Sequence, residues 1–292
     1  MGSSAPTIIA VPYDSGHRGA RMGAGPLQLL DHGLAERLAP HAAPVPVALV
    51  EPRGAWRAEI ATAFDLARGV ARHVRDVADA DGFPVVLSGN CGASLGAIAG
   101  LSSDGDDLGV VWLDAHGDLN TPETSGTGFL DGMALAALTG RCWTAMTRTI
   151  DGFRAIDDRR VLLIGARDLD PGERAVIERS ALTWTSAERL RDDGLTRALL
   201  PGLASLRAAG VRRVYLHVDV DVHDPALAPA NGFPAPGGLS PDDVQAIAML
   251  VGEPFGIAGL GISAYDPMHD PDGVTREVVM RLVESVVARA RR

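Results

Sequence analysis

Short apolar runs rich in β-branched residues alternate along this chain with longer segments in which apolar residues recur every three or four positions. Short runs of this kind are typical of buried strands in a parallel sheet, and the longer segments are typical of amphipathic helices. The pattern predicts strands at residues 7–11, 45–50, 84–88, 108–113, 160–164, 182–184, 213–218 and 255–262. It predicts helices at residues 25–38, 58–80, 93–101, 132–139, 171–179, 194–209, 240–251 and 273–289.

The repeated strand–loop–helix order indicates an α/β fold with a largely parallel sheet and helices on both faces. Ser240, Pro241 and the two acids that follow form a strong helix start, since Ser caps a helix and Pro suits its first position. A Pro/Ser-rich linker, a low-complexity run and a sequence repeat are all missing from the sequence. We therefore expect one domain over residues 1–292.

Composition narrows the class of protein. A formal net charge of −10 without a Lys/Arg-rich block argues against nucleic-acid binding. The longest apolar segments are of strand length, far short of the roughly 20 residues that a membrane helix needs. Two cysteines without a disulfide pattern, and no signal peptide, favour a cytoplasmic protein.

Two acidic clusters follow two of the predicted strands. The sequence DAHGD at 114–118 follows the strand at 108–113, and DVD at 219–221 follows the strand at 213–218. Carboxylates at the end of a buried strand are costly unless a cation neutralises them. Because ligands of α/β proteins bind where the carboxyl ends of strands meet, we expect the clusters to lie together. Four carboxylates and one imidazole can hold two divalent ions, which generate hydroxide from water near neutral pH.

The position of each acid in its cluster suggests its role. Asp114 and Asp219 are the first acids after their strands and are the natural bridging carboxylates. His116, Asp118 and Asp221 would then complete the shells of the individual ions. A carboxylate-rich site with one imidazole suits manganese, with iron, cobalt or zinc as alternatives.

With these motifs the chain resembles the arginase/agmatinase (ureohydrolase) family from about residue 7 onward. DAHGD at 114–118 and DVDVHDP at 219–225 resemble the two metal signatures of that family, and APANGFP at 228–234 and GGLS at 237–240 also match its pattern. The resemblance implies a three-layer α/β/α sandwich with a roughly eight-stranded sheet. It also implies a dinuclear manganese centre, hydrolysis of linear amidine C–N bonds, and a trimer or hexamer.

The loops that read the substrate in this family are partly present. Residues 118–127 resemble the arginase loop that binds a substrate α-carboxylate, and residues 167–173 resemble the segment whose second acid contacts the α-ammonium. The residues implied to hold an amino-acid head group are Asn120, Ser125, Thr127 and Asp170. Their presence favours an arginine-like small-molecule substrate over a decarboxylated one such as agmatine.

Three positions depart from the family pattern. SGNCG at 88–92 stands where the family has Gly-Gly-Asp-His-Ser, so Cys91 takes the place of the first histidine ligand. A thiolate is softer than an imidazole, which favours zinc, iron or cobalt on the Cys91 side. Asp131 stands where arginases carry a histidine credited with proton transfer. Ala264 replaces the glutamate that pairs with the substrate guanidinium, in a strand that lacks the acids of arginases.

These departures point away from plain arginine. Losing the partner of a buried cationic guanidinium costs roughly 3 to 5 kcal/mol. A hydroxyguanidine is much less basic and depends less on such a partner, and we associate the cysteine substitution with family members that hydrolyse hydroxyarginine to hydroxyurea and ornithine. The sequence therefore predicts a binuclear-metal amidinohydrolase for a guanidino or N-hydroxyguanidino amino acid.

The expected metal ligands are Cys91, Asp114, His116, Asp118, Asp219 and Asp221. The expected catalytic residues are Asp118, Asp131 and His116, with Asp118 passing a proton to the leaving amine. Two alternatives stay open: a metal-dependent hydrolase of a formimino or amide substrate, and a catalytically weak metal-binding regulatory subunit.

Other polar and thiol groups have simpler interpretations. Cys91 could instead be an inert buried residue, a neighbour of the ligands or a covalent nucleophile. His17 is expected in a surface loop, and His217 as a packed or hydrogen-bonded core histidine. His223 could line the mouth of the site. Cys142 is expected to pack at a helix end, and the acidic run at 104–107 to be a solvated loop.

Overall fold

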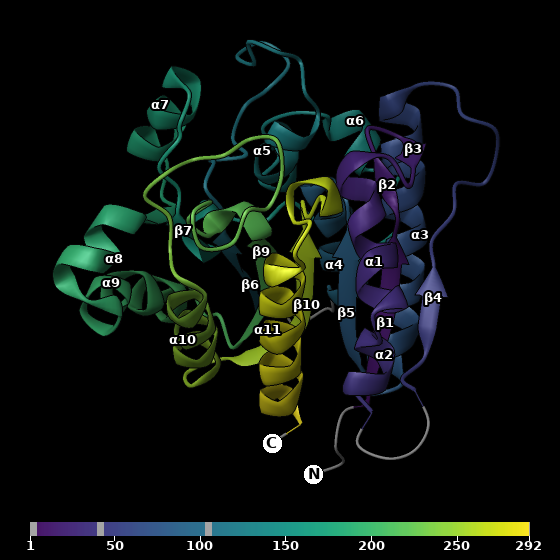
Figure 1. Cartoon of the computed structure of the whole chain (residues 1–292). Coiled ribbons are helices and arrows are strands. Elements are labelled where there is room, and N and C mark those ends of the chain that lie inside the picture. Colours follow the sequence, from purple (N-terminus) through teal and green to yellow (C-terminus); the bar gives the residue numbers. More distant parts are fainter. Residues whose placement is uncertain (1–4, 40–43, 103–106, 292) are drawn as a thin grey trace.

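The computed structural model describes residues 5–39, 44–102 and 107–291, and within them one sheet organises the chain. Its eight strands are all parallel (Figure 1). In spatial order they are β4 (Val47–Leu49), β1 (Pro6–Val11), β5 (Phe83–Ser88), β10 (Gly256–Ser263), β9 (Arg213–Asp219), β6 (Leu108–Leu113), β7 (Val161–Gly165) and β8 (Thr183–Ser186). Every predicted strand is present, with ends shifted by at most two residues.

Helices cover both faces of the sheet, as the alternating pattern predicted. One hydrophobic core joins a face of the sheet to α1 (Gly25–Asp31), α2 (Leu34–Arg37), α8 (Ala187–Asp193), α9 (Leu195–Ala208), α10 (Pro241–Gly252) and α11 (Val274–Ala290). A second core joins the other face to α3 (Glu59–Asp79), α4 (Ser94–Leu101), α5 (Ala134–Leu138), α6 (Thr144–Thr147) and α7 (Pro171–Arg179). This is the three-layer α/β/α sandwich that the resemblance implied.

The helix start at Ser240 has the predicted form. Ser240 Oγ accepts a hydrogen bond from the amide of Asp243 (3.1 Å), and Asp243 Oδ2 accepts one from the amide of Ser240 (3.1 Å). This reciprocal pair is a capping box, and it satisfies two amides at the start of α10.

Other local details differ from the sequence prediction. The helix predicted at 25–38 is two helices, because Gly33 between them adopts a left-handed φ of 85°. The prediction did not include α6, α8 or the small hairpin of β2 (Tyr13–Asp14) and β3 (His17–Arg18). Each of these elements is seven residues or shorter, too short for a clear periodic signal. Residues 104–106 of the predicted acidic loop lie outside the described residues, and so do residues 1–4 at the N-terminus.

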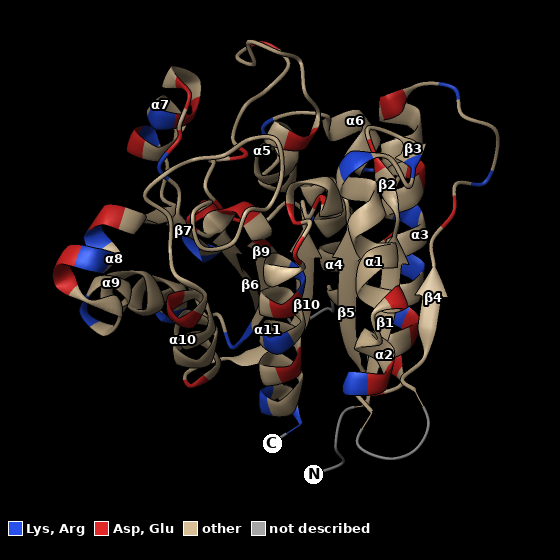
Figure 2. Cartoon of the chain, viewed as in Figure 1, with Lys and Arg blue, Asp and Glu red and all other residues tan. Residues whose placement is uncertain are grey.

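Alternation along β9 decides which side chains approach the site. Val214, Leu216 and Val218 face the first core, while Tyr215 faces the second. Since side chains alternate along a strand, His217 and Asp219 lie on the same face as Tyr215. Figure 2 shows acidic residues in the loops above β9, at the carboxyl edge of the sheet.

Candidate active site

A cavity of about 310 Å³ lies at the carboxyl edge of the sheet. Its wall contains most of the residues that the sequence predicted: Cys91, His116, Asp118, Asn120, Ser125, Thr127, Asp131, Asp170, Asp219, Asp221 and Ala264. Asp114 is buried next to them. Loops that are far apart in the sequence therefore converge on one cavity, as expected for loops that follow the carboxyl ends of parallel strands.

The first acidic cluster forms a tight turn directly after β6. Asp114 Oδ1 accepts a hydrogen bond from the amide of His116 (2.7 Å), and Asp114 Oδ2 accepts one from Trp112 Nε1 (3.0 Å). Asp118 adopts a φ of 52°, a left-handed conformation that residues other than glycine adopt uncommonly. Backbone strain of this kind persists only where the surroundings fix it, and it is often found in active sites.

The second acidic cluster is tied to the first by hydrogen bonds. Asp219 Oδ1 accepts from the amide of Asp221 (2.9 Å), and Asp221 Oδ1 accepts from the amide of Ala115 (3.2 Å). His116 Nδ1 lies 3.4 Å from both Asp114 Oδ1 and Asp221 Oδ2. The turns after β6 and β9 are thus held as one unit.

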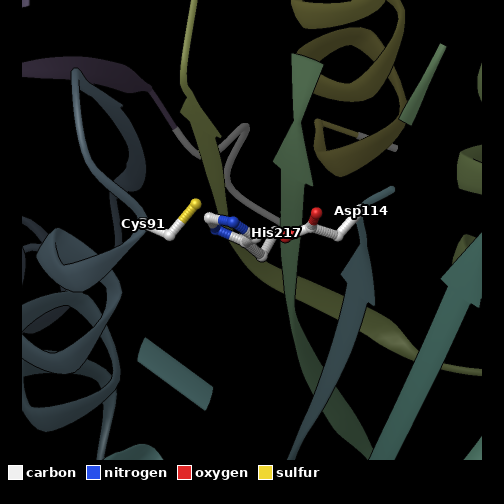
Figure 3. A group of neighbouring side chains, drawn as sticks. All are labelled: Cys91, Asp114 and His217. Atoms are coloured by element: carbon white, nitrogen blue, oxygen red, sulfur yellow. The ribbon is translucent and has the colours of Figure 1, made fainter. Parts of the chain in front are cut away.

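Two groups of potential metal donors meet at Asp114. Donor atoms of Asp114, His116 and Asp221 lie within 4.8 Å of one another, and so do those of Cys91, Asp114 and His217 (Figure 3). A carboxylate shared by two donor groups is placed as a bridging ligand would be, which is the role that the sequence predicted for Asp114. Asp118 and Asp219 belong to neither group but line the same cavity.

The electrostatics of the cluster fit divalent cations. Burial and the neighbouring acids hold the pKa values of Asp118 and Asp219 well above the ordinary carboxyl value. Asp118 Oδ2 is buried and lacks a hydrogen-bond partner among the described residues. Burial opposes ionisation of Asp221 as well, but the charge of His116 outweighs it and lowers the pKa. Crowded carboxylates with an orphaned oxygen form a donor set that metal ions would neutralise.

Cys91 begins a short 3₁₀ turn (Cys91–Ala93) between β5 and α4, and its thiol lies among polar groups. Cys91 Sγ is 3.0 Å from Asp219 Oδ2 and 3.0 Å from Ser263 Oγ. Burial, and then the charge of Asp219, raise the pKa of the thiol well above its ordinary value. These neighbours favour a role in or beside the metal ligands over inert packing, and the ligand role stays a prediction.

The predicted head-group residues line one wall of the cavity. The hydroxyl of Ser125 accepts a hydrogen bond from the amide of Gly128 (2.9 Å), and that of Thr127 accepts from the amide of Phe129 (3.2 Å). Each hydroxyl therefore keeps its proton for donation to another acceptor. A carboxylate is such an acceptor.

Asn120 and Asp170 are joined directly. Asn120 Nδ2 donates to Asp170 Oδ2 (2.8 Å). The amide of Asp170, the N-cap of α7, donates to Glu173 Oε2 (2.9 Å), and the amide of Leu119 donates to Glu173 Oε1 (3.0 Å). Glu173 was not predicted from the sequence, yet its buried carboxylate fixes the metal loop to the head-group loop.

Asp131 and Ala264 lie on the cavity wall, as their sequence positions suggested. Asn90 Nδ2 donates to Asp131 Oδ2 (2.8 Å), and burial raises the pKa of Asp131 to about 7. Asn90 is thus a hydrogen-bond partner of this carboxylate, and its donated hydrogen bond opposes the rise in the pKa of Asp131. Ala264 has a left-handed φ of 64°, and its carbonyl accepts from Asn231 Nδ2 (3.0 Å).

Sequence reasoning missed two further residues that hold the second cluster. Asn231 Nδ2 also lies 3.2 Å from Asp221 Oδ2. The guanidinium of Arg167 donates to the backbone carbonyls of Asp221 (2.9 Å), His223 (3.1 Å) and Ala235 (2.7 Å). Both residues lie in motifs that the sequence singled out, but their partners depend on how the loops pack.

The remaining histidines and Cys142 largely match their simpler interpretations. His17 is exposed and stacks on Trp56 with ring centroids 5.3 Å apart. His217 is buried and stacks on Trp112 at 3.6 Å. His223 is buried beside a separate cavity of about 250 Å³, so it does not line the candidate active site. Cys142 is buried near the end of α5.

Comparisons with known proteins agree with this fold. The Arginase family model matches residues 4–288. The arginase of Bacillus caldovelox is 31% identical over 291 residues, which is 96% of this chain and 97% of the relative. A crystal structure of arginase from that organism superposes with a TM-score of 0.88 at 29% identity, covering 97% of this chain and 98% of the other. Formimidoylglutamase of Bacillus subtilis shares the fold, with a TM-score of 0.77 at 16% identity and coverage of 100% and 88%. Within the described ranges, no helix is long and apolar enough to cross a membrane.

Proposed function

The chain belongs to the arginase family, whose members hydrolyse guanidino C–N bonds, and we propose that it is a binuclear-metal amidinohydrolase for an N-hydroxyguanidino amino acid. With Nω-hydroxyarginine, water would cleave the guanidino C–N bond to give ornithine and hydroxyurea. One observation carries this proposal: the acidic clusters, the head-group residues and the methyl group of Ala264 border the same cavity.

The residues that would hold the metal pair are Cys91, Asp114, His116, Asp118, Asp219 and Asp221. When bound, two divalent ions supply activation of water and neutralise the buried carboxylates. Manganese suits the carboxylate-rich side, and zinc, iron or cobalt suits the side of the thiol.

The head-group wall orients the substrate. The free hydroxyl protons of Ser125 and Thr127 would be donated to the substrate α-carboxylate, and the carboxylate of Asp170 would accept from the α-ammonium. Asn120, held by Asp170, completes this wall. Fixing both ends of the amino-acid head group places the guanidino carbon at a set distance from the acidic clusters.

Proton transfer falls to two aspartates of the cavity wall. Asp118, with an unpartnered carboxylate oxygen, is placed to pass a proton to the leaving nitrogen. Asp131, whose pKa is raised to about 7 by burial, can both accept and give a proton near neutral pH. His116, between Asp114 and Asp221, supports this chemistry as a ligand.

Ala264 supports the choice of a hydroxyguanidine. A cationic guanidinium that enters this cavity finds a methyl group at the position where the resemblance implies a glutamate. A hydroxyguanidine is less basic, so it loses its proton at a lower cost and depends less on a carboxylate partner. The alanine at this position therefore supports the proposal of hydroxyarginine over arginine for a reason independent of the metal.

The test is a substrate panel on the metal-loaded protein. Nω-hydroxyarginine, arginine, agmatine and an N-formimino amino acid are compared by release of ornithine, urea, hydroxyurea and ammonia. We expect kcat/KM for hydroxyarginine to exceed that for arginine at least about 10-fold, the ratio given by 1.4 kcal/mol. Arginine turning over as well as hydroxyarginine would contradict the proposed substrate.

The same panel separates the alternatives. Preferential turnover of the formimino compound would favour the second enzyme function, which Ala264 also permits. Metal binding without turnover of any compound would favour a regulatory subunit. A homo-oligomer, a trimer or hexamer, and a cytoplasmic location stay predictions, which size-exclusion chromatography with light scattering and cell fractionation would test.

A further inference from the structure

His217 lies beneath the acidic clusters, on the same face of β9 as Asp219. It is buried, and its ring stacks on Trp112 with centroids 3.6 Å apart. Figure 3 shows the side chains of Cys91, Asp114 and His217 pointing toward one another from three different segments. Their donor atoms all lie within 4.8 Å of one another.

We propose that His217 is a metal ligand in this chain, and that it forms with Cys91 and Asp114 a mixed thiolate–imidazole–carboxylate site selective for zinc or cobalt over manganese. The inference rests on the proposed function, because it concerns one half of the same metal pair. It changes the expected ligand set: the imidazole that is missing at position 91 is supplied from position 217 on β9, which β10 separates from β5, the strand that precedes Cys91.

The hydrogen bonds of the ring leave one nitrogen suited to a metal. Nδ1 of His217 lies 2.9 Å from Ser94 Oγ, whereas Nε2 has only a longer contact, 3.3 Å, with Ser263 Oγ. Metal-binding histidines commonly donate one ring N–H to a fixed partner, which orients the ring and leaves the other nitrogen to bind the ion. Ser94 can be that partner, and Nε2 is on the side of Ser263, whose hydroxyl also contacts Cys91 Sγ at 3.0 Å.

The neighbouring strand leaves room for this arrangement. Gly261 of β10 pairs in register with His217. A Cβ at Gly261 would lie 2.0 Å from the hydroxyl of Tyr215, which would have to move, whereas its distance of 3.4 Å from His217 Nδ1 is an ordinary van der Waals contact. The strand that lacks the acids of arginases is thus the strand whose glycine leaves room for the Tyr215 side chain and lies against the buried imidazole.

The donor set determines the type of ion. Zn–S and Zn–N bonds are about 2.3 and 2.0 Å, so two donors of one ion lie up to about 4 Å apart, which is close to the limit of 4.8 Å within which these three donor atoms lie. Thiolate and imidazole favour zinc or cobalt, while manganese favours oxygen ligands. One thiolate, one carboxylate and one neutral imidazole also balance the charge of a divalent ion. Three protein ligands leave a position open, as in catalytic zinc sites.

The test counts imidazole ligands directly. Wild type, His217→Gln and Cys91→Ser are each loaded with one equivalent of zinc, and X-ray absorption measures the sulfur and imidazole ligands per ion. We expect one sulfur and at least one imidazole in the wild type, one imidazole fewer in His217→Gln, and no sulfur in Cys91→Ser. Chelator competition should show zinc affinity reduced at least about 100-fold in His217→Gln, more than the 10- to 100-fold typical of a residue behind the ligands.

Two further variants keep the result interpretable. His223→Gln removes another buried histidine, so it controls for general loss of stability, and circular dichroism checks the fold of each variant. If His217→Gln does not fold, His116→Asn is used: sulfur and imidazole should remain on the same zinc, and loss of the imidazole would overturn the inference. An unchanged imidazole count in folded His217→Gln would overturn it as well.

The outcomes separate this inference from the proposed function. Wild type that hydrolyses hydroxyarginine, together with an unchanged imidazole count in His217→Gln, refutes the ligand role of His217 and leaves the function intact. A His217-dependent zinc site without turnover of any guanidino compound refutes the function and leaves the ligand role intact. Wild type that binds no metal refutes both.

Discussion

The substitution Asp170→Asn tests the substrate head group without disturbing the fold. Asp170 is the N-cap of α7 and lies on the cavity wall, where its Oδ2 accepts from Asn120 Nδ2 at 2.8 Å. Asparagine is as good an N-cap as aspartate, so the helix should form normally. The substitution removes the negative charge that would face a substrate α-ammonium.

The magnitude follows from the loss of one charged hydrogen bond. Hydrogen bonds to charged groups contribute about 1.5 to 3 kcal/mol, which corresponds to roughly a 10- to 150-fold loss in kcat/KM. Because the ammonium is remote from the reacting carbon, most of the loss should raise KM and leave kcat nearly unchanged.

The assay pairs each variant with a truncated substrate. Wild type and Asp170→Asn are compared on Nω-hydroxyarginine and on its analogue without the α-amino group, with thermal unfolding as a check on the fold. Asp168→Asn is the matched control, since Asp168 lines the same cavity two residues earlier. The loss should vanish for the truncated analogue. An equal loss on both substrates, or the same loss in Asp168→Asn, would refute the assignment of Asp170 to the ammonium.

Three more predictions concern the metal ligands and their support. Cys91→His should raise manganese retention and arginine turnover, measured by metal analysis and urea release, whereas Cys142→Ser should change neither; unchanged metal content in Cys91→His would place the thiol outside the ligand set. Arg167→Ala should lower the free energy of unfolding by about 2 to 4 kcal/mol, because several backbone carbonyls lose their donor at once. Arg167→Lys should recover part of this free energy in denaturant titrations. A change below about 0.5 kcal/mol, the size of a surface substitution, would contradict the prediction. Metal removal should reverse the pH dependence of stability. The raised pKa values of Asp118 and Asp219 mean that the folded metal-free chain binds more protons than the unfolded chain. Its stability should therefore fall as pH rises above 3.8, the ordinary pKa of an aspartate, and added metal should restore the stability. Thermal melting of chelated protein that is flat with pH, or that rises toward pH 8, would speak against that linkage.

The order of strands along the chain could be predicted from the sequence because buried parallel strands are apolar on both faces. Residues 108–113 appear as an unbroken apolar run and form β6 with the same ends. The long periodic segment at 58–80 forms α3 with nearly the same ends, since an amphipathic stripe of that length has few other solutions. The break at Gly33 was not readable, because a glycine within a helical pattern is often tolerated.

The candidate site was predictable for residues that directly follow a strand, because the carboxyl ends of parallel strands lie together. Acids directly after β6 and β9 had to lie at the carboxyl edge, and the structure brings Asp114, His116 and Asp221 within 4.8 Å. The support provided by Glu173 and Arg167 was not predictable, since it depends on where their long side chains end. A sequence identifies such residues but does not give their partners.

By itself the sequence determined the α/β class, the acidic clusters and the departures at Cys91, Asp131 and Ala264, because each is carried by residue type and by position relative to a strand. Tertiary structure alone decided what surrounds those departures. It placed His217 of β9 beside Cys91 and opposite Gly261 of β10, and it placed Asn90 on Asp131. The physical reason is the order of the strands. β5, β10, β9 and β6 are neighbours in the sheet but far apart in the chain, so the contacts between their side chains exist only once the sheet has formed.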